Sequence, residues 1–458
     1  MAEGFATDRK MTAPEGLMWR LEKDSYLSST FGTVSILDRP PDFDRLRARM
    51  ERAVAAVPRL GWRVHPAPTD FSSPLWTDDP DFDIDYHVRR VALPKPARTR
   101  DLLDLAALLV ADPFERTRPL WHFFVVEGLR GGKAAVVQKM HHTITDGEGG
   151  IQLALQYLDF ERDAAEPPPV VPAAIVAPSP PSGLDALRDL LTASFRLPLA
   201  VARQVRELLA DPTSIPDANR AAVDMIRGVV TQLADTERAH SPLWTDRSLR
   251  RRLEIARAPF VPTRDAARRL GGTLNTAFLT AAADAAGRYH AELGTPVDTL
   301  TASMAVSTRT AVTESNAFSL ARLVVPTGRM PIAERFQQVQ RAADDARRGQ
   351  GGASLSQLAA VAGALPTSLV TRVARQQAQT IDFATSNVRG APVPVYIAGA
   401  QLLENYPVGP LAGVAFNMTL LSYAGSLDVG LHIDAAAVAE PARLGRLLQR
   451  SFRDLAAA

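Results

Sequence analysis

The sequence contains no cysteine among its 458 residues. This absence excludes disulfide bonds, thiolate metal sites and a cysteine nucleophile. Lysine is also scarce, because nearly all basic residues are arginine; the lysines are Lys10, Lys23, Lys95, Lys133 and Lys139. We attribute the arginine bias to a GC-rich genome. The net charge is only +2, so the overall electrostatics give no indication of a nucleic-acid partner.

Long apolar runs are missing as well. Two uncharged stretches, 351–371 and 405–427, come closest, but prolines, glycines and polar residues interrupt both. A membrane-spanning helix needs about 20 consecutive apolar residues, so we expect buried strands or helices at both places. Residues 1–10 are polar and acidic, unlike a signal peptide. Together these features predict a cytoplasmic protein.

Glycine-rich nucleotide-binding loops and a Gly-x-Ser-x-Gly nucleophile motif are absent too. An apolar content of 46% and a charged content of 22% are typical of a globular protein. The chain is too long for one ordinary core, so we expect two domains. Strand and helix patterns in both halves predict an α/β architecture. A proline- and alanine-rich stretch begins at 164, and we place the boundaries at 1–163, 164–240 (linker and crossover helices) and 241–458.

Period-2 and period-3.6 patterns predict most elements. Helices are expected at 41–58, 101–112, 150–160, 275–290 and 441–455, and strands at 31–37, 121–129, 133–140, 301–306, 321–325, 393–397, 412–421 and 427–433. Trp121 belongs either to the core or to a channel wall. We favour the core, because large aromatic side chains are usually buried for packing.

The octapeptide at 140–147, Met-His-His-Thr-Ile-Thr-Asp-Gly, organises the rest of the chain. The apolar run before it predicts a strand that ends at the histidines, and adjacent strand residues point to opposite faces. One histidine can therefore face a reaction channel while the other faces the scaffold. An oriented neutral imidazole is the natural general base near pH 7. We take His142 as this base and His141 as its neighbour, with Asp146 bracing a turn that Gly147 permits.

Two other interpretations of the octapeptide compete. Two histidines and an aspartate could bind a metal ion, but neighbours that point in opposite directions cannot share one ion. The histidines could also be a buried structural pair. The complete His-His-x-x-x-Asp-Gly spacing favours the catalytic base, and we expect neither a metal nor a bound cofactor.

This spacing is the signature of the acyl-CoA-dependent acyltransferase superfamily, which includes chloramphenicol acetyltransferase and peptide-synthetase condensation domains. Other stretches closely resemble the bacterial wax ester synthase/diacylglycerol acyltransferases. They are Arg118-Pro119-Leu120-Trp121, Val126-Glu127-Gly128-Leu129, Trp76-Thr77-Asp78-Asp79-Pro80, Asp85-Tyr86-His87-Val88-Arg89-Arg90, Ser386-Asn387-Val388-Arg389-Gly390 and Tyr406-Pro407-Val408-Gly409-Pro410. The resemblance covers most of the chain except the proline-rich middle.

The resemblance implies two chloramphenicol-acetyltransferase-like subdomains, each a mixed sheet with flanking helices, and an active-site channel between them. It implies acyl-CoA as co-substrate and a fatty alcohol or diacylglycerol as acceptor, giving wax ester or triacylglycerol. Without a cysteine or a nucleophile elbow, direct transfer is expected. Gly147, Asn275, Ser386 and Asn387 match the family's motifs and are candidate substrate-binding residues. The two asparagines are candidate donors to the tetrahedral oxyanion.

The chain departs from the family pattern at several positions. Residues 26–31 replace a Pro-Met-His-Val-like stretch, and Thr276 replaces an acidic residue after Asn275. Arg389 and Ala391 replace prolines, which should loosen that loop. If Arg389 points inward, it favours an acceptor with a polar or anionic head; if it points into solvent, as surface arginines usually do, it changes little.

Two arginine-rich segments allow alternative readings. The helix expected at 184–209 could contact a membrane or lipid droplet, or could pack across the two domains with its arginines in water, which we favour slightly. The cluster at 247–252 could bind coenzyme A phosphates, but a solvated strand end is the favoured reading. No protein partner is predicted.

Three functions remain open at this point. The first is wax ester or triacylglycerol synthesis, and the second is the same chemistry on a more polar acceptor such as a polyketide or small alcohol. The third is a non-enzymatic lipid-binding relative.

Overall fold

A computed structural model describes residues 8–67, 73–145, 150, 153–167, 239–307, 318–348, 359, 362–363 and 365–458. Its helices are α1 (Ala13–Leu21), α2 (Phe43–Ala56), α3 (Ile84–His87), α4 (Thr99–Ala111), α9 (Phe260–Arg269), α10 (Leu274–Glu292), α11 (Ile332–Arg348), α13 (Thr367–Ala378) and α14 (Pro441–Ala457), with 3-10 turns η1 (Ser25–Leu27) and η2 (Pro58–Gly61). Its strands are β1 (Thr30–Leu37), β2 (Trp62–His65), β3 (Leu75–Asp78), β4 (Val88–Ala92), β5 (Trp121–Leu129), β6 (Lys133–His141), β7 (Leu158–Asp159), β8 (Arg251–Pro259), β9 (Thr299–Ser307), β10 (Phe318–Pro326), β11 (Phe383–Arg389), β12 (Tyr396–Ile397), β13 (Ala400–Val408), β14 (Phe416–Tyr423) and β15 (Ser426–Asp434).

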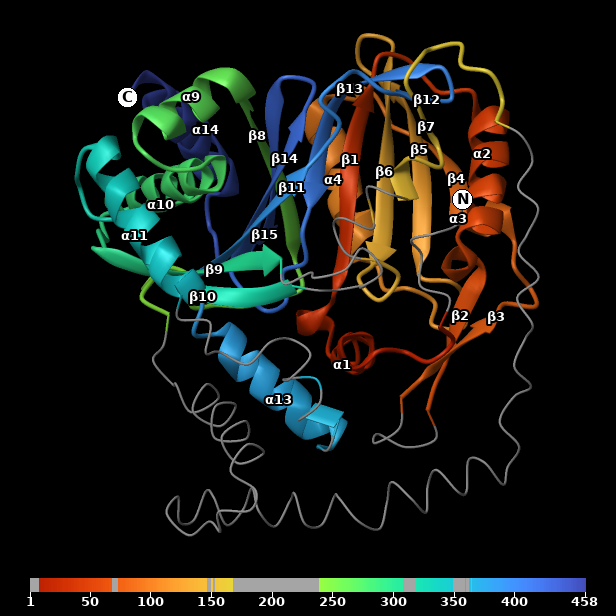
Figure 1. Ribbon diagram of the computed structural model, residues 1–458, viewed down its shortest axis with the longest axis horizontal. Coiled ribbons are helices and arrows are strands. Elements are labelled where there is room, and N and C mark those ends of the chain that lie inside the picture. Colours follow the sequence, from red (N-terminus) through yellow and green to blue (C-terminus); the bar gives the residue numbers. More distant parts are fainter. Residues whose placement is uncertain are drawn as a thin grey trace.

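The first sheet has the strand order β4-β5-β6-β1-β13-β12-β7 and carries the histidine motif at the end of β6. Alternate residues of β6 enter different cores. Val136 and Met140 pack with Leu46 and Met50 of α2, whereas Ala135 and Val137 face the leucines and alanines of α4. Helices therefore cover both faces of this sheet (Figure 1).

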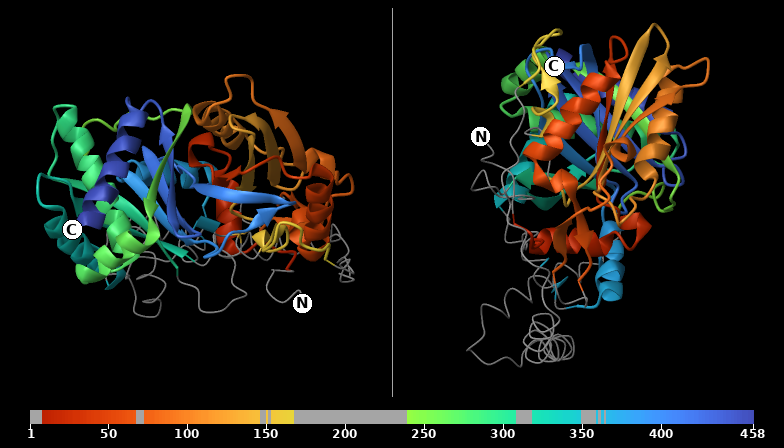
Figure 2. Two further views of the ribbon diagram at one scale, coloured as in Figure 1. Left: turned by 90° about the horizontal axis from the view of Figure 1, so that it is seen from above. Right: turned by 90° about the vertical axis from the view of Figure 1, so that its right-hand side faces the viewer.

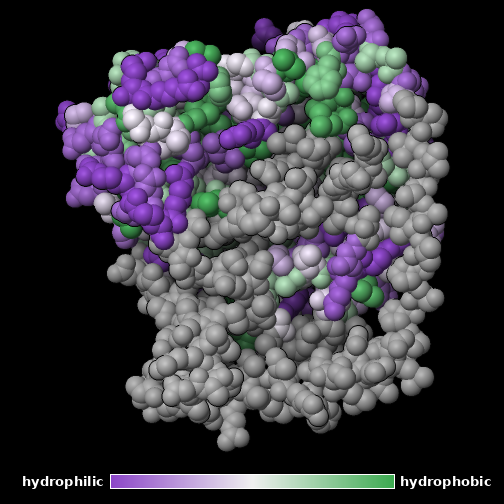
Figure 3. Space-filling model, viewed as in Figure 1, coloured by the Kyte–Doolittle hydropathy of each residue, from purple (hydrophilic) through white to green (hydrophobic). Residues whose placement is uncertain are grey.

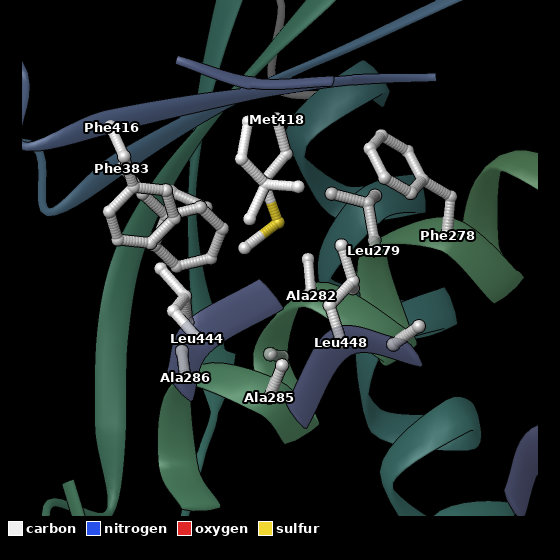
Figure 4. Close-up of a cluster of buried hydrophobic side chains, with 14 of the residues drawn as sticks. Phe278, Leu279, Ala282, Ala285, Ala286, Phe383, Phe416, Met418, Leu444 and Leu448 are labelled. Carbon is white, nitrogen blue, oxygen red and sulfur yellow. The ribbon is translucent and has the colours of Figure 1, made fainter. Parts of the chain in front are cut away.

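The second sheet has the strand order β10-β9-β11-β14-β15-β8. Helices α10 and α14 pack on one face of it, and the alanines of α10 let α14 approach closely. Figure 4 shows this core, with the rings of Phe383 and Phe416 stacked at 5.2 Å and Met418 beside Leu279. On the outer faces of α9 and α11 the exposed side chains are mainly hydrophilic (Figure 3).

The two sheets share chain segments. Strands β12 and β13 come late in the sequence, yet β13 pairs with β1 through the register Gly32↔Val408 to Leu37↔Leu402. In Figures 1 and 2 these blue strands extend into the red and orange half. Strand β13 also crosses the second sheet, because the amide of Asn405 donates to Asp428 (2.8 Å) and Gly430 lies against the carbonyl of Pro407. The first sheet is thus completed by the second half of the chain.

Helix α4 forms another contact between the halves. Arg100 pairs with Glu254 (2.8 Å) of β8, and Arg252 pairs with Asp104 (3.0 Å) of α4. Leu253 enters the same hydrophobic cluster as the leucines of α4. The halves are therefore joined by a shared sheet and a shared core.

Most of the expected elements are confirmed, including the 121–129 and 133–140 hairpin and the closing helix. Trp121 is fully buried and donates its indole N–H to the carbonyl of Leu60 (2.8 Å), so it belongs to the core. The helix expected at 150–160 is wrong in its second half, because Leu158–Asp159 forms β7. Asp159 is held there by Arg45 (3.2 Å) and Arg49 (3.1 Å) of α2.

Two further strand predictions need correction. The strand expected at 412–421 begins only at Phe416, because Ala412 and Gly413 adopt positive φ angles of 45° and 87° in the turn before it. The strand expected at 393–397 is confined to Tyr396–Ile397. The helix expected at 184–209 and nearly all of 164–240 lie outside the described residues. In the part of the chain that is described, no helix combines the length and apolarity needed to cross a bilayer.

Candidate functional site

The histidine motif begins on the last residue of β6 and continues into a turn. The amide of His141 donates to the carbonyl of Leu120 (3.0 Å), and the amide of His142 donates to the carbonyl of Ser29 (3.1 Å), just before β1. Both backbone positions are therefore fixed by neighbouring strands. Asp146 and Gly147, the remaining motif residues, lie outside the described residues.

His141 faces the scaffold. Its side chain is 1% exposed. Its Nδ1 accepts from the backbone N–H of Thr143 (3.1 Å) and contacts the Thr143 hydroxyl (2.8 Å), while Nε2 lies 3.1 Å from the Glu22 carboxylate. Because a carboxylate only accepts, these contacts favour the neutral tautomer that carries its proton on Nε2.

Glu22 connects the two strands that flank the site. Its carboxylate also accepts from the hydroxyl of Ser28 (2.6 Å) and the amide of Ser29 (2.8 Å). Burial opposes the charge of this carboxyl, but the hydrogen bonds from His141 and the serines prevail and lower the pKa of Glu22 below its usual value. Sequence reasoning missed Glu22, because nothing in the local pattern points to a partner 119 positions away.

His142 occupies a different environment. Its side chain is half-buried, and its ring centroid lies 4.5 Å from that of Phe31 at an interplanar angle of 37°. Phe31 pairs with Met140 across β1 and β6 and packs on the same cluster. His142 thus lies on the Phe31 side of the sheet, away from the Glu22 contact of its neighbour.

A buried ion pair supports the turn that follows. Arg59 contacts Glu15 and donates to the carbonyl of Thr143 (3.1 Å). Both charged side chains are almost completely buried, at 3% and 0% exposure. The pair links α1 and η2 to the backbone immediately after His142.

Strand β11 carries three of the residues singled out in the second half, and they lie on opposite faces of the strand. Val388 packs against the cluster that contains Met140 of the first half. Ser386 lies two residues earlier and shares this face, whereas Asn387 and Arg389 alternate to the opposite face. Of the two faces, the one carrying Ser386 is turned toward the first half.

Asn275 and Asn387 come together on the other face. They line a cavity of about 250 Å³ with Arg347, Arg389 and the end of β9. Asn275, in the first turn of α10, also contacts the sulfur of Met304 at 3.0 Å. The structure therefore groups the two asparagines with two arginines and places Ser386 apart from them.

The arginine cluster at 247–252 is occupied by structural contacts. Arg247 donates to the carbonyls of Gly413 (2.7 Å) and Trp244 (2.6 Å). Arg251 donates to the carbonyl of Ser248 (2.6 Å), and Arg252 is one of the ion pairs with α4 described above. These side chains hold the start of β8, and Arg251, whose side chain is 10% exposed, does not lie at a solvated strand end.

Metal binding has little support in the described part of the chain. No group of three or more His, Asp or Glu side chains there could hold an ion. Both ring nitrogens of His141 are already engaged by Thr143 and Glu22, so a shared ion would have to break those contacts. What the arrangement can do chemically is accept a proton at one half-buried imidazole beside an oriented partner.

Comparisons with known families match nearly the whole chain. Residues 11–278 match the wax ester synthase/diacylglycerol acyltransferase catalytic domain, and residues 314–456 match the C-terminal domain of the same family. A Mycobacterium tuberculosis protein named as a diacylglycerol O-acyltransferase is 32% identical over 452 residues, covering 96% of this chain and 90% of its own. A second protein of that organism with the same type of name is 28% identical, covering 98% and 97%.

Solved structures show the same fold. A wax ester synthase/diacylglycerol acyltransferase from Marinobacter aquaeolei superposes with a TM-score of 0.68 at 20% identity, covering 98% of each chain. A starter condensation domain of rhizomide synthetase, solved with C8-CoA, has a TM-score of 0.56 at 12% identity, covering 99% of this chain and 94% of its own. The expected architecture of two sheet-based halves with flanking helices is thereby confirmed.

Proposed function

Because this chain belongs to the wax ester synthase/diacylglycerol acyltransferase family, we propose that it transfers a long-chain acyl group from acyl-CoA to an alcohol. The acceptor is a fatty alcohol or diacylglycerol, and the product a wax ester or triacylglycerol. The observation that carries this proposal is the end of β6, where Glu22 and Thr143 hold His141 and His142 emerges half-buried beside Phe31.

In this mechanism His142 accepts the proton of the acceptor hydroxyl. The alcohol oxygen then attacks the thioester carbonyl, and the tetrahedral intermediate collapses by expelling the thiolate of coenzyme A, which takes the proton back from His142. The mechanism uses no covalent acyl-enzyme, since the chain has neither a cysteine nor a Gly-x-Ser-x-Gly nucleophile motif. Ser386 is the candidate donor to the oxyanion, because it lies on the face of β11 turned toward the first half.

The test is release of coenzyme A from palmitoyl-CoA with hexadecanol, diacylglycerol and short polar alcohols. We expect turnover with at least one acceptor and its loss in His142→Ala. Acyl-CoA binding without coenzyme A release from any acceptor would instead support a lipid-binding protein. Unchanged release by His142→Ala would contradict the assigned base.

A more polar acceptor is the second candidate function. Arg389 is exposed and lines the cavity with Arg347, and a hydrocarbon chain offers nothing to a guanidinium. Equal or better turnover of hexadecanol than of polar alcohols would rule this candidate out.

Because the proposed substrates of acyl transfer are lipids, we retain 184–209 as a candidate contact with a membrane or lipid droplet.

A further inference from the structure

The cavity between α10, α11, β9 and β11 combines several residues that distinguish this chain. Arg389, one departure from the family pattern, lies in its wall, and Thr276, another departure, is connected to Arg347 by hydrogen bonds. Arg389 lines the cavity directly with Arg347, Asn275 and Asn387. Among the described residues that line it, none is acidic. Two guanidinium groups and two amides therefore line one side of an open hollow of about 250 Å³ with hydrogen-bond donors.

Thr276 acts on the cavity through a chain of hydrogen bonds. It is fully buried, and its hydroxyl donates to the side-chain oxygen of Gln340 (2.5 Å). The amide of Gln340 donates to Asp344 (2.7 Å), whose carboxylate accepts from Arg347 (3.2 Å). All four residues belong to α10 or α11, so the hydroxyl at 276 helps to fix the position of Arg347.

From this arrangement we infer that the cavity binds an anionic group, a carboxylate or a phosphate, of one of the two substrates. Arg347 shares its charge with Asp344 (3.2 Å), so Arg389 supplies most of the attraction for an anion, and guanidinium groups bind carboxylate and phosphate oxygens in pairs. The anion comes either from the head of an acyl acceptor or from the phosphates of coenzyme A. This inference rests on the proposed acyl transfer. It adds that one of the two substrates carries a negatively charged group, which the cavity binds.

The experiment measures KM for matched substrates in Arg389→Gln and Arg347→Gln. The acceptors are hexadecanol and 16-hydroxyhexadecanoate, which differ at one end of the chain by a carboxylate. The donors are palmitoyl-CoA and S-palmitoyl-pantetheine, which lacks the nucleotide. Arg348→Gln is the control, because this neighbour pairs with Asp345, is 72% exposed and does not line the cavity.

If the anion belongs to the acceptor, Arg389→Gln raises KM for 16-hydroxyhexadecanoate by about tenfold or more and leaves hexadecanol unchanged. If the anion belongs to coenzyme A, Arg389→Gln raises KM for palmitoyl-CoA and leaves KM for S-palmitoyl-pantetheine unchanged. Thr276→Val should raise the same KM by a smaller factor. If Arg389→Gln and Arg347→Gln had the same KM values as Arg348→Gln for all four substrates, the inference would be overturned.

A binding measurement separates this inference from the proposed function. Calorimetric titration with hexadecanoate and with adenosine 3′,5′-bisphosphate requires no turnover. We expect one of these anions to bind the wild-type protein and to bind Arg389→Gln about tenfold more weakly. Failure of coenzyme A release with this binding intact would reject the acyl transfer alone, whereas equal binding by both proteins would reject the anion site.

Discussion

At the scale of single residues, the side chains of the two adjacent histidines have different surroundings. His141 is enclosed by Glu22 and Thr143, and His142 lies against the ring of Phe31. The strand alternation predicts that the two histidines point in different directions, but it does not say which of them faces the scaffold. The identity of the carboxylate behind it was not predictable, because Glu22 reaches His141 only through the three-dimensional arrangement of η1, β1 and β6.

We predict that His142→Ala lowers the rate of acyl transfer roughly a hundredfold to ten-thousandfold, the usual worth of a general base. Its melting temperature should stay near the wild-type value, since the side chain is only half-buried. His141→Ala should retain more activity but unfold at lower temperature, because the Glu22 carboxylate loses a hydrogen bond worth about 1–3 kcal/mol. Coenzyme A release and thermal unfolding of both variants check this pair; the reverse order of activities would exchange the two roles.

Glu22 should behave as a positioning residue. We expect Glu22→Ala to lower kcat about tenfold to a hundredfold with little change in KM, because His141 loses the acceptor that sets its tautomer. Glu22→Gln keeps an acceptor oxygen and should restore most of kcat. The control is Asp24→Ala, which removes a nearby carboxylate that pairs with Arg375 (2.6 Å) and should leave kcat unchanged. Equal kcat losses in Glu22→Ala and Asp24→Ala would mean that Glu22 acts only on stability.

At the scale of elements, α1 and η2 reach the site through the ion pair of Glu15 and Arg59. We predict that Arg59→Met lowers the unfolding free energy by about 3–5 kcal/mol, because Glu15 loses a buried counter-charge. The double variant Arg59→Met/Glu15→Leu should recover part of this loss. Denaturant unfolding of the two proteins makes the comparison, and a double variant less stable than Arg59→Met would show that the charge is not the cause.

The elements themselves were largely predictable from periodicity, but their partners were not. The alternation in 121–140 identifies a hairpin, since a short glycine-containing turn leaves few other pairings. In contrast, the side-chain pattern of a strand such as β13 has a period of two whichever strand lies beside it. Its pairing with β1 also joins residues that are separated by most of the chain. The cavity formed by Asn275 and Asn387 depends on such distant pairings, so their proximity was not predictable either.

At the scale of the whole molecule, buried histidines make the fold sensitive to acid. Burial lowers the pKa of His87 to about 4, of His122 to about 3 and of His432 to about 4, from 6.5. The unfolded chain therefore binds protons that the native state does not. Stability should fall as the pH drops from about 6.5 to about 4, by up to about 1.4 kcal/mol per pH unit for each histidine.

Urea unfolding at pH 7, 6 and 5 measures this slope. His432→Asn removes one of the titrating rings but can still donate to the carbonyl of Gly409, the partner of His432 at 2.8 Å. Its stability should therefore depend less steeply on pH than that of the wild-type protein. Identical slopes for the two proteins would exclude His432 as a source of the acid sensitivity.

The contact between the two sheets tolerates no side chain at Gly430. A Cβ there would lie 1.9 Å from the carbonyl oxygen of Pro407. Gly430→Ala should force β15 and β13 apart and lower the unfolding free energy by about 1–3 kcal/mol or more. Gly16→Ala is the control, since its added Cβ would meet nothing closer than 3.7 Å and alanine favours the helix. Equal melting temperatures for the two variants would contradict the close approach.

The late position of β13 has a consequence for how the protein is made. Strands β5, β6 and β1 leave the ribosome early, but the strand that pairs with the free edge of β1 begins only at Ala400. Ribosomes add about 5–20 residues per second, so this edge waits on the order of tens of seconds for its partner. An open edge is a template for pairing with another nascent chain. Newly synthesised molecules should therefore depend on chaperones until translation has passed Val408.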